Sequence, residues 1–351
     1  MGKRYILILG HCQEIVVTLQ TGMATQFPHA LRACIEDAVQ QNGRVATIMG
    51  AAAQMSERYR RIEGKGNNRH FQLKNPDEAL AYLVARLPAT FSANMRVLEL
   101  VRDLVPDFAP ASVLDVGAGP GTASFAASQL WDFQNLTLVE PNIHLKDVGT
   151  RFITPEIDAD ISWAPSGLEK SLPEGTYDLV LASYVLNELN SSHWSDAIRN
   201  LWDRCSGTMV IVETGTPLGF SVIERVRSLL PRLNGAYLAG PCPQDGVCPL
   251  SQEENRWCHF SVRVERSKMH KSLKSGSTLG YEDEKFSWIA LSRAPVKRPT
   301  CRIIGHPSTA RVTALQVCTK EGQAQTMEIA KSSPLYKATR KLEWGDGFDH
   351  E

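Results

Sequence analysis

The segment Val113-Leu114-Asp115-Val116-Gly117-Ala118-Gly119-Pro120-Gly121-Thr122 decides the fold, because it runs from an apolar strand through a glycine turn into a helix. Glycine lets a backbone pass close to a ligand, and the first turn of a helix offers unpaired N–H groups. The spacing is G-x-G-x-G rather than G-x-G-x-x-G, which disfavours a pyrophosphate cofactor. The segment therefore predicts a ligand site of another nucleotide-like kind at the end of this strand.

Short apolar strands alternate with helices on the C-terminal side of this turn. Strands are predicted at 112–116, 135–140, 177–183 and 208–213, with helices starting near Gly121, Asn142, Ser192 and Leu218. This alternation is typical of an α/β protein with a doubly wound parallel sheet. Residues 1–109 are predicted to be mostly helical, and 286–292 to return to the sheet. Segments 311–317 and 325–329 are predicted to form a C-terminal β hairpin.

Glu140 lies nineteen residues after Gly121, at the end of the second predicted strand. A carboxylate there can bind both hydroxyls of a ribose. With Asp115, Gly117 and Gly119, this arrangement resembles motif I and the acidic loop of class I S-adenosylmethionine-dependent methyltransferases. The resemblance implies a Rossmann-like core with S-adenosylmethionine as cofactor. The alternative from the residues alone is an empty, vestigial loop.

Three polar residues follow the strand predicted at 177–183, namely Ser183, Asn187 and Glu188. In an open α/β sheet the ligand lies beyond the carboxyl ends of the strands, so these residues are expected to face the methyl-transfer position. We take Ser183 as a cofactor contact, and Asn187 and Glu188 as catalytic candidates. The Asn-Pro-Pro-Tyr motif of amino methyltransferases is absent, and Asn187 and Glu188 could equally cap the next helix. Catalytic activity therefore stays open.

The charges of the 351-residue chain balance, with 38 Lys and Arg against 38 Asp and Glu, but they are segregated. Residues 132–188 contain ten acids and three bases, whereas residues 256–302 contain eleven bases and four acids. This pattern indicates a small or cationic ligand for the first segment and a polyanion for the second, although both could be ordinary solvated faces. No apolar run is long enough to span a membrane, so we expect an intracellular protein.

Three of the eight cysteines, Cys242, Cys248 and Cys258, lie among prolines and glycines that turn the chain back on itself. Such a compact segment is suited to a metal site, which needs a fourth ligand from elsewhere. The candidates for that ligand are Cys318, Cys301 and His259. Thiolate ligands favour zinc or an iron–sulfur cluster. The alternative is three unconnected loop cysteines.

A more specific resemblance rests on the segment 235–249, on Trp257-Cys258-His259-Phe260-Ser261, on 282–293, and on Arg340-Lys341 with Trp344-Gly345-Asp346. These segments resemble the ribosomal small-subunit methyltransferase-like family, over about residues 28–346. Mitochondrial members of that family are assembly factors of the mitoribosomal small subunit. The resemblance implies a 4Fe-4S cluster on Cys242, Cys248, Cys258 and Cys318, and it offers no place for Cys301.

The same resemblance implies association with the rRNA of a small-subunit precursor. A basic stretch directly follows Cys258 and is expected to neutralise phosphates. Its RNA-binding candidates are Arg263, Arg266, Lys268, Lys271 and Lys274.

Together these features predict a small ribosomal subunit biogenesis factor. An active rRNA methyltransferase is the first alternative, and a small-molecule methyltransferase with a structural zinc is the second. Four parts are expected: an N-terminal helical domain (1–110), a methyltransferase core (111–232), a Cys-rich basic region (233–295) and a C-terminal β extension (296–351). We expect a cytoplasmic protein, or one of the mitochondrial matrix if the source is eukaryotic.

Overall fold

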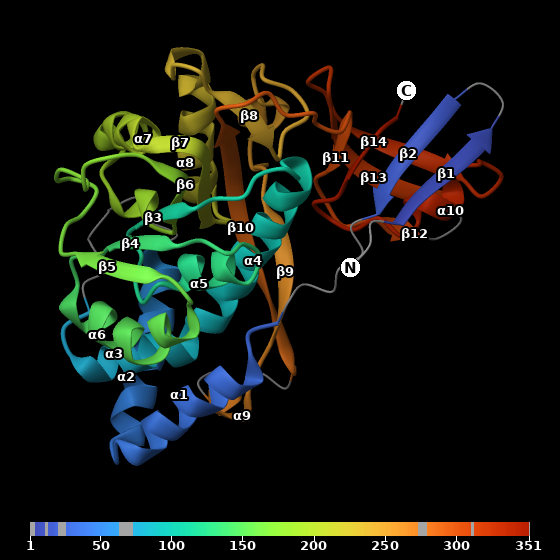
Figure 1. Ribbon diagram of the computed structural model, residues 1–351. Helices are drawn as coiled ribbons and strands as arrows, with labels where there is room; N and C mark the ends of the chain where they lie inside the picture. Colours follow the sequence, from blue (N-terminus) through green and yellow to red (C-terminus); the bar gives the residue numbers. More distant parts are fainter. Residues whose placement is uncertain are drawn as a thin grey trace.

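The computed structural model describes residues 4–10, 13–19, 26–62, 73–272, 279–309 and 312–350, without the side chains of 4–19 and 56–62. An eight-stranded sheet forms its centre (Figure 1). The sheet consists of β3 (Ser112–Val116), β4 (Asn135–Val139), β5 (Asp160–Ala164), β6 (Tyr177–Ser183), β7 (Cys205–Thr214), β8 (Tyr237–Gly240), β9 (Phe260–Glu265) and β10 (Tyr281–Ser292).

The strands lie side by side in the order β5-β4-β3-β6-β7-β10-β8, and β9 pairs with the other half of β10. Strands β3 to β7 are parallel, whereas β10 runs antiparallel to both β7 and β8. A parallel sheet with one reversed strand inserted next to its last member is the class I methyltransferase arrangement. The α/β, Rossmann-like prediction is therefore confirmed.

Helices cover both faces of the sheet. Alternate residues of each inner strand point to opposite faces, so that Leu179 and Leu181 join one core while Val180 and Ala182 join the other. Both faces are buried, which explains why these strands are continuously apolar. The covering helices are α1 (His29–Gln41), α2 (Val45–Ile62), α3 (Pro76–Ala85), α4 (Leu87–Leu104), α5 (Thr122–Ser128) and α6 (Ile143–Phe152) on the first face, and α7 (Trp194–Asp203) and α8 (Pro217–Leu229) on the second.

The N-terminal part differs from the helical prediction at its start. Residues 4–19 form an antiparallel hairpin of β1 (Arg4–Gly10) and β2 (Gln13–Leu19), which lies beside the C-terminal sheet (Figure 1). The strands are rich in Ile, Val and Thr, which favour extended backbone. From His29 to Leu104 the described elements are the helices α1 to α4, as predicted.

A second sheet forms a smaller C-terminal unit with its own core. It contains β11 (Cys301–Ile303), β12 (Ser308–Thr309), β13 (Val312–Thr319), β14 (Ala324–Ala330) and β15 (Gly347–Phe348), with α10 (Tyr336–Thr339) packed on one face. Strands β13 and β14 pair antiparallel, which confirms the predicted hairpin; its first expected residue, Arg311, lies outside the described residues. The short helix α9 (Lys268–Ser272) follows β9.

Candidate functional site

The glycine turn after β3 adopts a conformation that only glycine holds without strain. Gly117, Gly119 and Gly121 have φ angles of +70°, +56° and +92°. A Cβ on Gly117 would lie 2.3 Å from a methyl carbon of Val185, so the turn packs tightly against the end of β6. A Cβ on Gly119 would meet nothing within 4 Å, and therefore this glycine faces open space.

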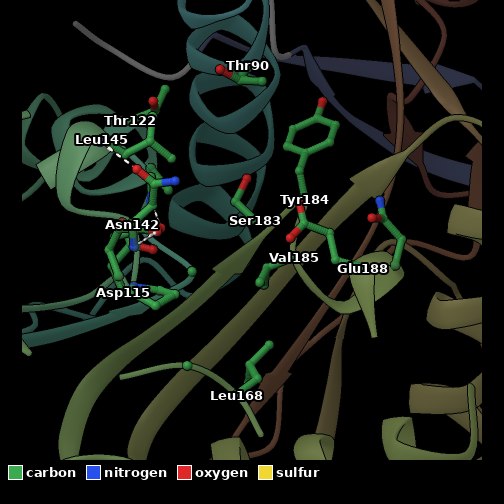
Figure 2. A pocket seen from close by; sticks show the side chains of 18 of the residues that line it. Thr90, Asp115, Thr122, Asn142, Leu145, Leu168, Ser183, Tyr184, Val185 and Glu188 are labelled. Carbon is green, nitrogen blue, oxygen red and sulfur yellow. Dashed lines mark hydrogen bonds between the residues drawn. The ribbon is translucent and has the colours of Figure 1, made fainter. Parts of the chain in front are cut away.

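That open space is a cavity of about 700 Å³ beyond the carboxyl ends of the parallel strands (Figure 2). Asp115, Gly117, Gly119, Glu140 and Ser183 all line it, as do both catalytic candidates. Gly121 does not line it; its place is the first position before α5, where its left-handed backbone turns the chain into the helix. The volume is suited to a nucleoside-sized ligand.

The two acidic residues of the turn are held by backbone and hydroxyl donors. The Gly119 N–H donates to Glu140 Oε2 at 2.9 Å, and the Asn142 N–H donates to Glu140 Oε1 at 2.8 Å. Asp115 Oδ2 accepts from the Ser124 hydroxyl at 2.7 Å. Burial raises the pKa of Asp115 to about 6 and also raises the pKa of Glu140, partly opposed by these hydrogen bonds.

Three buried polar atoms around the cavity have no hydrogen-bond partner within the described structure: Asp115 Oδ1, Thr122 Oγ1 and Ser183 Oγ. Buried polar atoms are rarely left unpaired in native proteins, since each costs the desolvation of its group. All three residues line the cavity, where a ligand can supply the missing partners.

The catalytic candidates Asn187 and Glu188 have different surroundings. The Asn187 side-chain amide donates to Glu213 Oε2 at 2.6 Å, and Glu213 Oε1 accepts from the Leu186 N–H at 2.9 Å. Glu213 is fully buried, which raises the pKa of its carboxyl to about 8. Asn187 is thus committed to ordering the turn after β6.

Glu188, by contrast, lines the cavity and its carboxyl forms no hydrogen bond or ion pair with any described residue. Burial raises the pKa of Glu188 to about 8, and the nearby Glu140 carboxylate adds to the rise. Of the two candidates, Glu188 is the one whose carboxyl is available to contact a bound molecule.

Sequence reasoning missed the part of the cavity wall that comes from the N-terminal helices, including Arg86. The Arg86 guanidinium pairs with Glu284 Oε1 at 3.1 Å, and the Tyr184 hydroxyl donates to the same oxygen at 3.2 Å. Tyr184 has a φ of +57°, a strained value for an aromatic residue. These residues are about one hundred positions apart, and no local pattern connects them.

The four predicted cluster cysteines lie close enough for their charges to interact. Burial raises the pKa of Cys258 well above its usual value, and Cys242, Cys248 and Cys318 each add to the rise. Burial raises the pKa of Cys318 to about 12, again with contributions from Cys242 and Cys248. Among the described residues, however, no three His, Cys, Asp or Glu side chains are close enough together to hold a single metal ion.

The register of the C-terminal sheet separates Cys318 from Cys301, which are two of the three candidates for a fourth ligand. Cys318 lies directly opposite Arg302, and Cys301 lies opposite Thr319. Because neighbouring residues of a strand point to opposite faces, Cys301 points into the C-terminal core with Ile303. Cys318 points the other way, toward the cysteine-rich segment.

Two buried arginines flank the cysteines. Arg227 is 7% exposed and donates to the carbonyls of Gln244 and Gly246, within the loop that joins Cys242 to Cys248. Arg302 is 3% exposed and donates to the Pro241 carbonyl at 2.8 Å. Burial lowers the pKa of Arg302 to about 10.

These arginines are short of negative partners. No carboxylate in the described part of the chain pairs with Arg227. Arg302 shares Asp346 with Arg96, whose ion pair with Asp346 measures 2.8 Å. Burial acts to lower the pKa of Arg227, but the charges of Cys242, Cys248 and Cys318 outweigh it and raise that pKa.

Part of the basic stretch after Cys258 is neutralised within the protein. Arg263 lies opposite Asp283 in the β9–β10 pairing and contacts it at 3.0 Å, and Arg266 pairs with Glu282 at 2.8 Å. Lys268 is exposed and Lys271 half-buried, whereas Lys274 lies outside the described residues. Two of the five RNA-binding candidates therefore have their charge compensated within the protein.

Residues 76–349 match the family described as mitochondrial small ribosomal subunit Rsm22. The chain belongs to the Rsm22 family. Curated relatives include the human mitochondrial ribosome assembly protein METTL17, 24% identical over 76% of this chain and 62% of the relative. The Rsm22-cox11 tandem protein 2 of Schizosaccharomyces pombe, also mitochondrial, is 26% identical over 78% and 43%. The chain thus spans less than two thirds of the length of these relatives.

Solved structures similar to this Rsm22 family member include methyltransferases. Magnesium protoporphyrin IX methyltransferase from Synechocystis PCC 6803, with bound SAM, has a TM-score of 0.37 at 14% identity, covering 77% of this chain and all of that one. The N-methyltransferase NodS from Bradyrhizobium japonicum has a TM-score of 0.39 at 13% identity, covering 62% and 98%. The fold assignment depends on strand order rather than on these scores. No described helix is long and apolar enough to cross a membrane.

Proposed function

We propose that this Rsm22 family member is a biogenesis factor of the small ribosomal subunit that binds small-subunit rRNA. The match to the family over residues 76–349 carries this proposal. The methyltransferase domain serves as a binding domain for S-adenosylmethionine, and four cysteines hold a 4Fe-4S cluster. The protein acts where the precursor subunit is made, in the cytoplasm of a bacterium or in the mitochondrial matrix of a eukaryote.

The cavity residues are suited to S-adenosylmethionine. Glu140 retains lone pairs for the ribose hydroxyls, and Asp115 Oδ1 and Ser183 Oγ offer partners for the polar end of the ligand. Glu140 and Glu188 place two carboxyl groups on the cavity wall, and a bound cation would favour their charged forms. When bound, the cofactor supplies an electrophilic methyl group next to the carboxyl end of β6.

The cysteine surroundings are suited to a metal group that four thiols share. Each cysteine of a 4Fe-4S cluster binds a different iron atom, so the four sulfurs stand apart by the width of the cluster. Four thiols whose charges interact lie near enough to one another to share one metal group. A closed zinc site would require the thiols to draw together, and zinc is the alternative to be tested.

The buried arginines supply a second reason to expect an anionic group at the cysteines. Arg302 and Arg96 share Asp346, and no described carboxylate pairs with Arg227, which leaves two positive charges in excess. A doubly positive metal group bound by four thiolates carries two negative charges and would balance them. An isolated buried charge is costly, so the filled site is the favourable one.

An active rRNA methyltransferase is the second candidate function, favoured by one observation. The unpartnered carboxyl of Glu188 lines the cavity at the end of β6, where a proton from a methylated nucleophile would have to go. In that case Glu188, held deprotonated beside the cationic cofactor, would receive the proton while the cavity walls orient the nucleophile.

Two measurements test these functions together: crosslinking to rRNA and base-resolution mapping of methyl groups. Both use a deletion strain that is complemented with the wild type or with a Glu188→Gln variant. Biogenesis without chemistry predicts crosslinks to small-subunit rRNA, a subunit defect in the deletion strain, and no methyl group lost with either allele. A methyl group that disappears with the deletion and with Glu188→Gln would instead establish the enzyme. Absence of any rRNA crosslink in the complemented strain would reject both.

A further inference from the structure

The C-terminal sheet carries an unbroken run of positive charge. Between Glu328 and Glu343 the chain has four basic residues and no acidic one. We call this group the basic cap; its members are Lys331, Lys337, Arg340 and Lys341. All four are exposed.

The basic cap is held rigidly by apolar anchors. Helix α10 continues as a helical turn, with Arg340 N–H donating to the Tyr336 carbonyl and Leu342 N–H to the Thr339 carbonyl, each at 3.1 Å. Ala338 and Leu342 are 1% and 3% exposed and belong to the C-terminal core. Lys337, Arg340 and Lys341 follow helical i, i+3, i+4 spacing and therefore share one face of this turn.

The charges of the basic cap are uncompensated, unlike those of Arg263 and Arg266 in the stretch after Cys258. No ion pair in the described part of the protein involves any of its four members. Arg263 and Arg266, in contrast, each have an acidic partner on β10. A surface that only solvates a protein normally mixes both signs, whereas fixed cations of one sign are suited to a polyanion.

The position of the basic cap links it to the cysteine site. Residues Leu315 and Val317 of β13 face the core beneath α10, while Cys318 faces the cysteine-rich segment on the other side. One face of the sheet therefore attaches to the methyltransferase domain through Cys318 and Arg302, and the other face presents α10 outward. A filled cysteine site would fix the direction in which the basic cap points.

We propose that the basic cap is the principal phosphate-binding surface for RNA, in place of Arg263 and Arg266. This inference rests on the proposed function, since it assumes an rRNA partner. Phosphate contacts give affinity and orientation without sequence readout, and each neutralised phosphate releases counterions. The affinity is therefore expected to depend steeply on salt.

The test compares two charge-matched variants of the full chain for binding of a small-subunit rRNA fragment over a range of salt concentrations. The first variant is Lys331→Glu, Lys337→Glu, Arg340→Glu, Lys341→Glu. The control reverses four exposed bases of the methyltransferase domain and its N-terminal helices, as Lys74→Glu, Arg151→Glu, Arg225→Glu, Arg232→Glu. Iron content and S-adenosylmethionine affinity verify that both variants fold.

We expect the basic-cap variant to bind at least about 100-fold more weakly and to lower the salt slope by about four, with a much smaller change in the control. Equal binding by the cap variant and the wild type, or equal losses in both variants, would overturn the inference. If the basic-cap variant bound rRNA as the wild type does but no longer bound an acidic ribosomal protein, the inference would also be overturned, and the basic cap would be a protein-binding surface. A wild-type chain without rRNA affinity would instead reject the proposed function itself.

Discussion

The cavity at the glycine turn and the cysteine site differ in how completely the chain satisfies its own buried polar groups. In the cavity, both oxygens of Glu140 accept backbone N–H groups, and Asn187 is bonded to Glu213. Only three buried atoms there await a partner. At the cysteine site, whole charges on Arg227 and Arg302 lack a sufficient counter-charge within the described structure.

This difference indicates how each site depends on its occupant. A cavity whose walls are already bonded to one another can stand empty at little cost. A site built around buried positive charge is stable only when an anionic group fills it. We therefore expect substitutions in the cavity to change mainly the affinity for its ligand, and substitutions at the cysteine site to change the stability of the whole fold.

The largest effect is expected from Cys258→Ser. Loss of one of four thiolates should remove nearly all bound iron and lower the melting temperature of anaerobically purified protein. The matched control is Cys301→Ser, because Cys301 faces the C-terminal core rather than the other cysteines. Iron content and absorbance near ~400 nm are the measurements. Full iron content in Cys258→Ser, or a colourless wild type with one zinc, would refute the cluster.

The effect of Arg227→Gln on the free energy of unfolding should have opposite signs with the cysteine site filled and with it empty. In the filled protein it removes a buried counter-charge, so unfolding free energy should fall by about 3 kcal/mol and the cluster should become harder to reduce. In chelator-treated protein it removes an unbalanced charge, and stability should stay equal or rise.

The control for this reversal is Arg293→Gln. Arg293 donates to the carbonyls of Trp202, Cys205 and Asn234, away from the cysteine site. Its effect on denaturant unfolding should be the same with and without metal. An Arg227→Gln effect that is likewise independent of metal would mean that the two sites do not differ as described.

Gly119→Arg should weaken S-adenosylmethionine binding by at least about 100-fold, equivalent to about 2.7 kcal/mol, without loss of iron. The new side chain would occupy the open space that Gly119 faces. Gly43→Arg is a matched control, since Gly43 also has a positive φ and open surroundings but lies outside the cavity. Calorimetric binding that is unchanged in Gly119→Arg would exclude the glycine turn as the site.

The smallest effect concerns Glu188 and pH. Burial raises the pKa of its carboxyl to about 8, so its folded form favours the proton. Its contribution to stability is therefore complete below about pH 4.5 and is lost as the pH rises through about 8. Glu188→Gln should match the wild type near pH 4.5 and exceed it at pH 8.5 by roughly 2 kcal/mol, after allowance for solvent in the cavity. Identical pH profiles would indicate an ordinary, solvated carboxyl.

Local patterns were sufficient to predict the methyltransferase core. The turn from Val113 to Thr122 and the alternating strands are short-range features, and burial on both faces leaves a continuous apolar signal in β6 and β7. Strands β5 and β8 were missed, as was the hairpin at 4–19, because short or edge strands leave weak patterns.

Which charged residues form ion pairs depends on strand register, and local sequence patterns do not specify that register. Arg263 in β9 and Asp283 in β10 are opposite one another only because the two strands pair antiparallel. The same reasoning applies to Cys318 and Cys301, which differ in the face of the sheet and not in their residue type.

The sequence by itself determined the fold class and the place of the cofactor turn, because both follow from the periodicity and glycines of a single stretch of chain. It also indicated the Cys-rich segment and, through a family resemblance, its fourth cysteine. Only the tertiary structure decided which charged side chains form ion pairs within the protein and which stay available to a partner. Such pairs bring together residues about one hundred positions apart, as when Arg86 and Tyr184 both contact Glu284. Local sequence patterns do not predict contacts between residues so far apart along the chain.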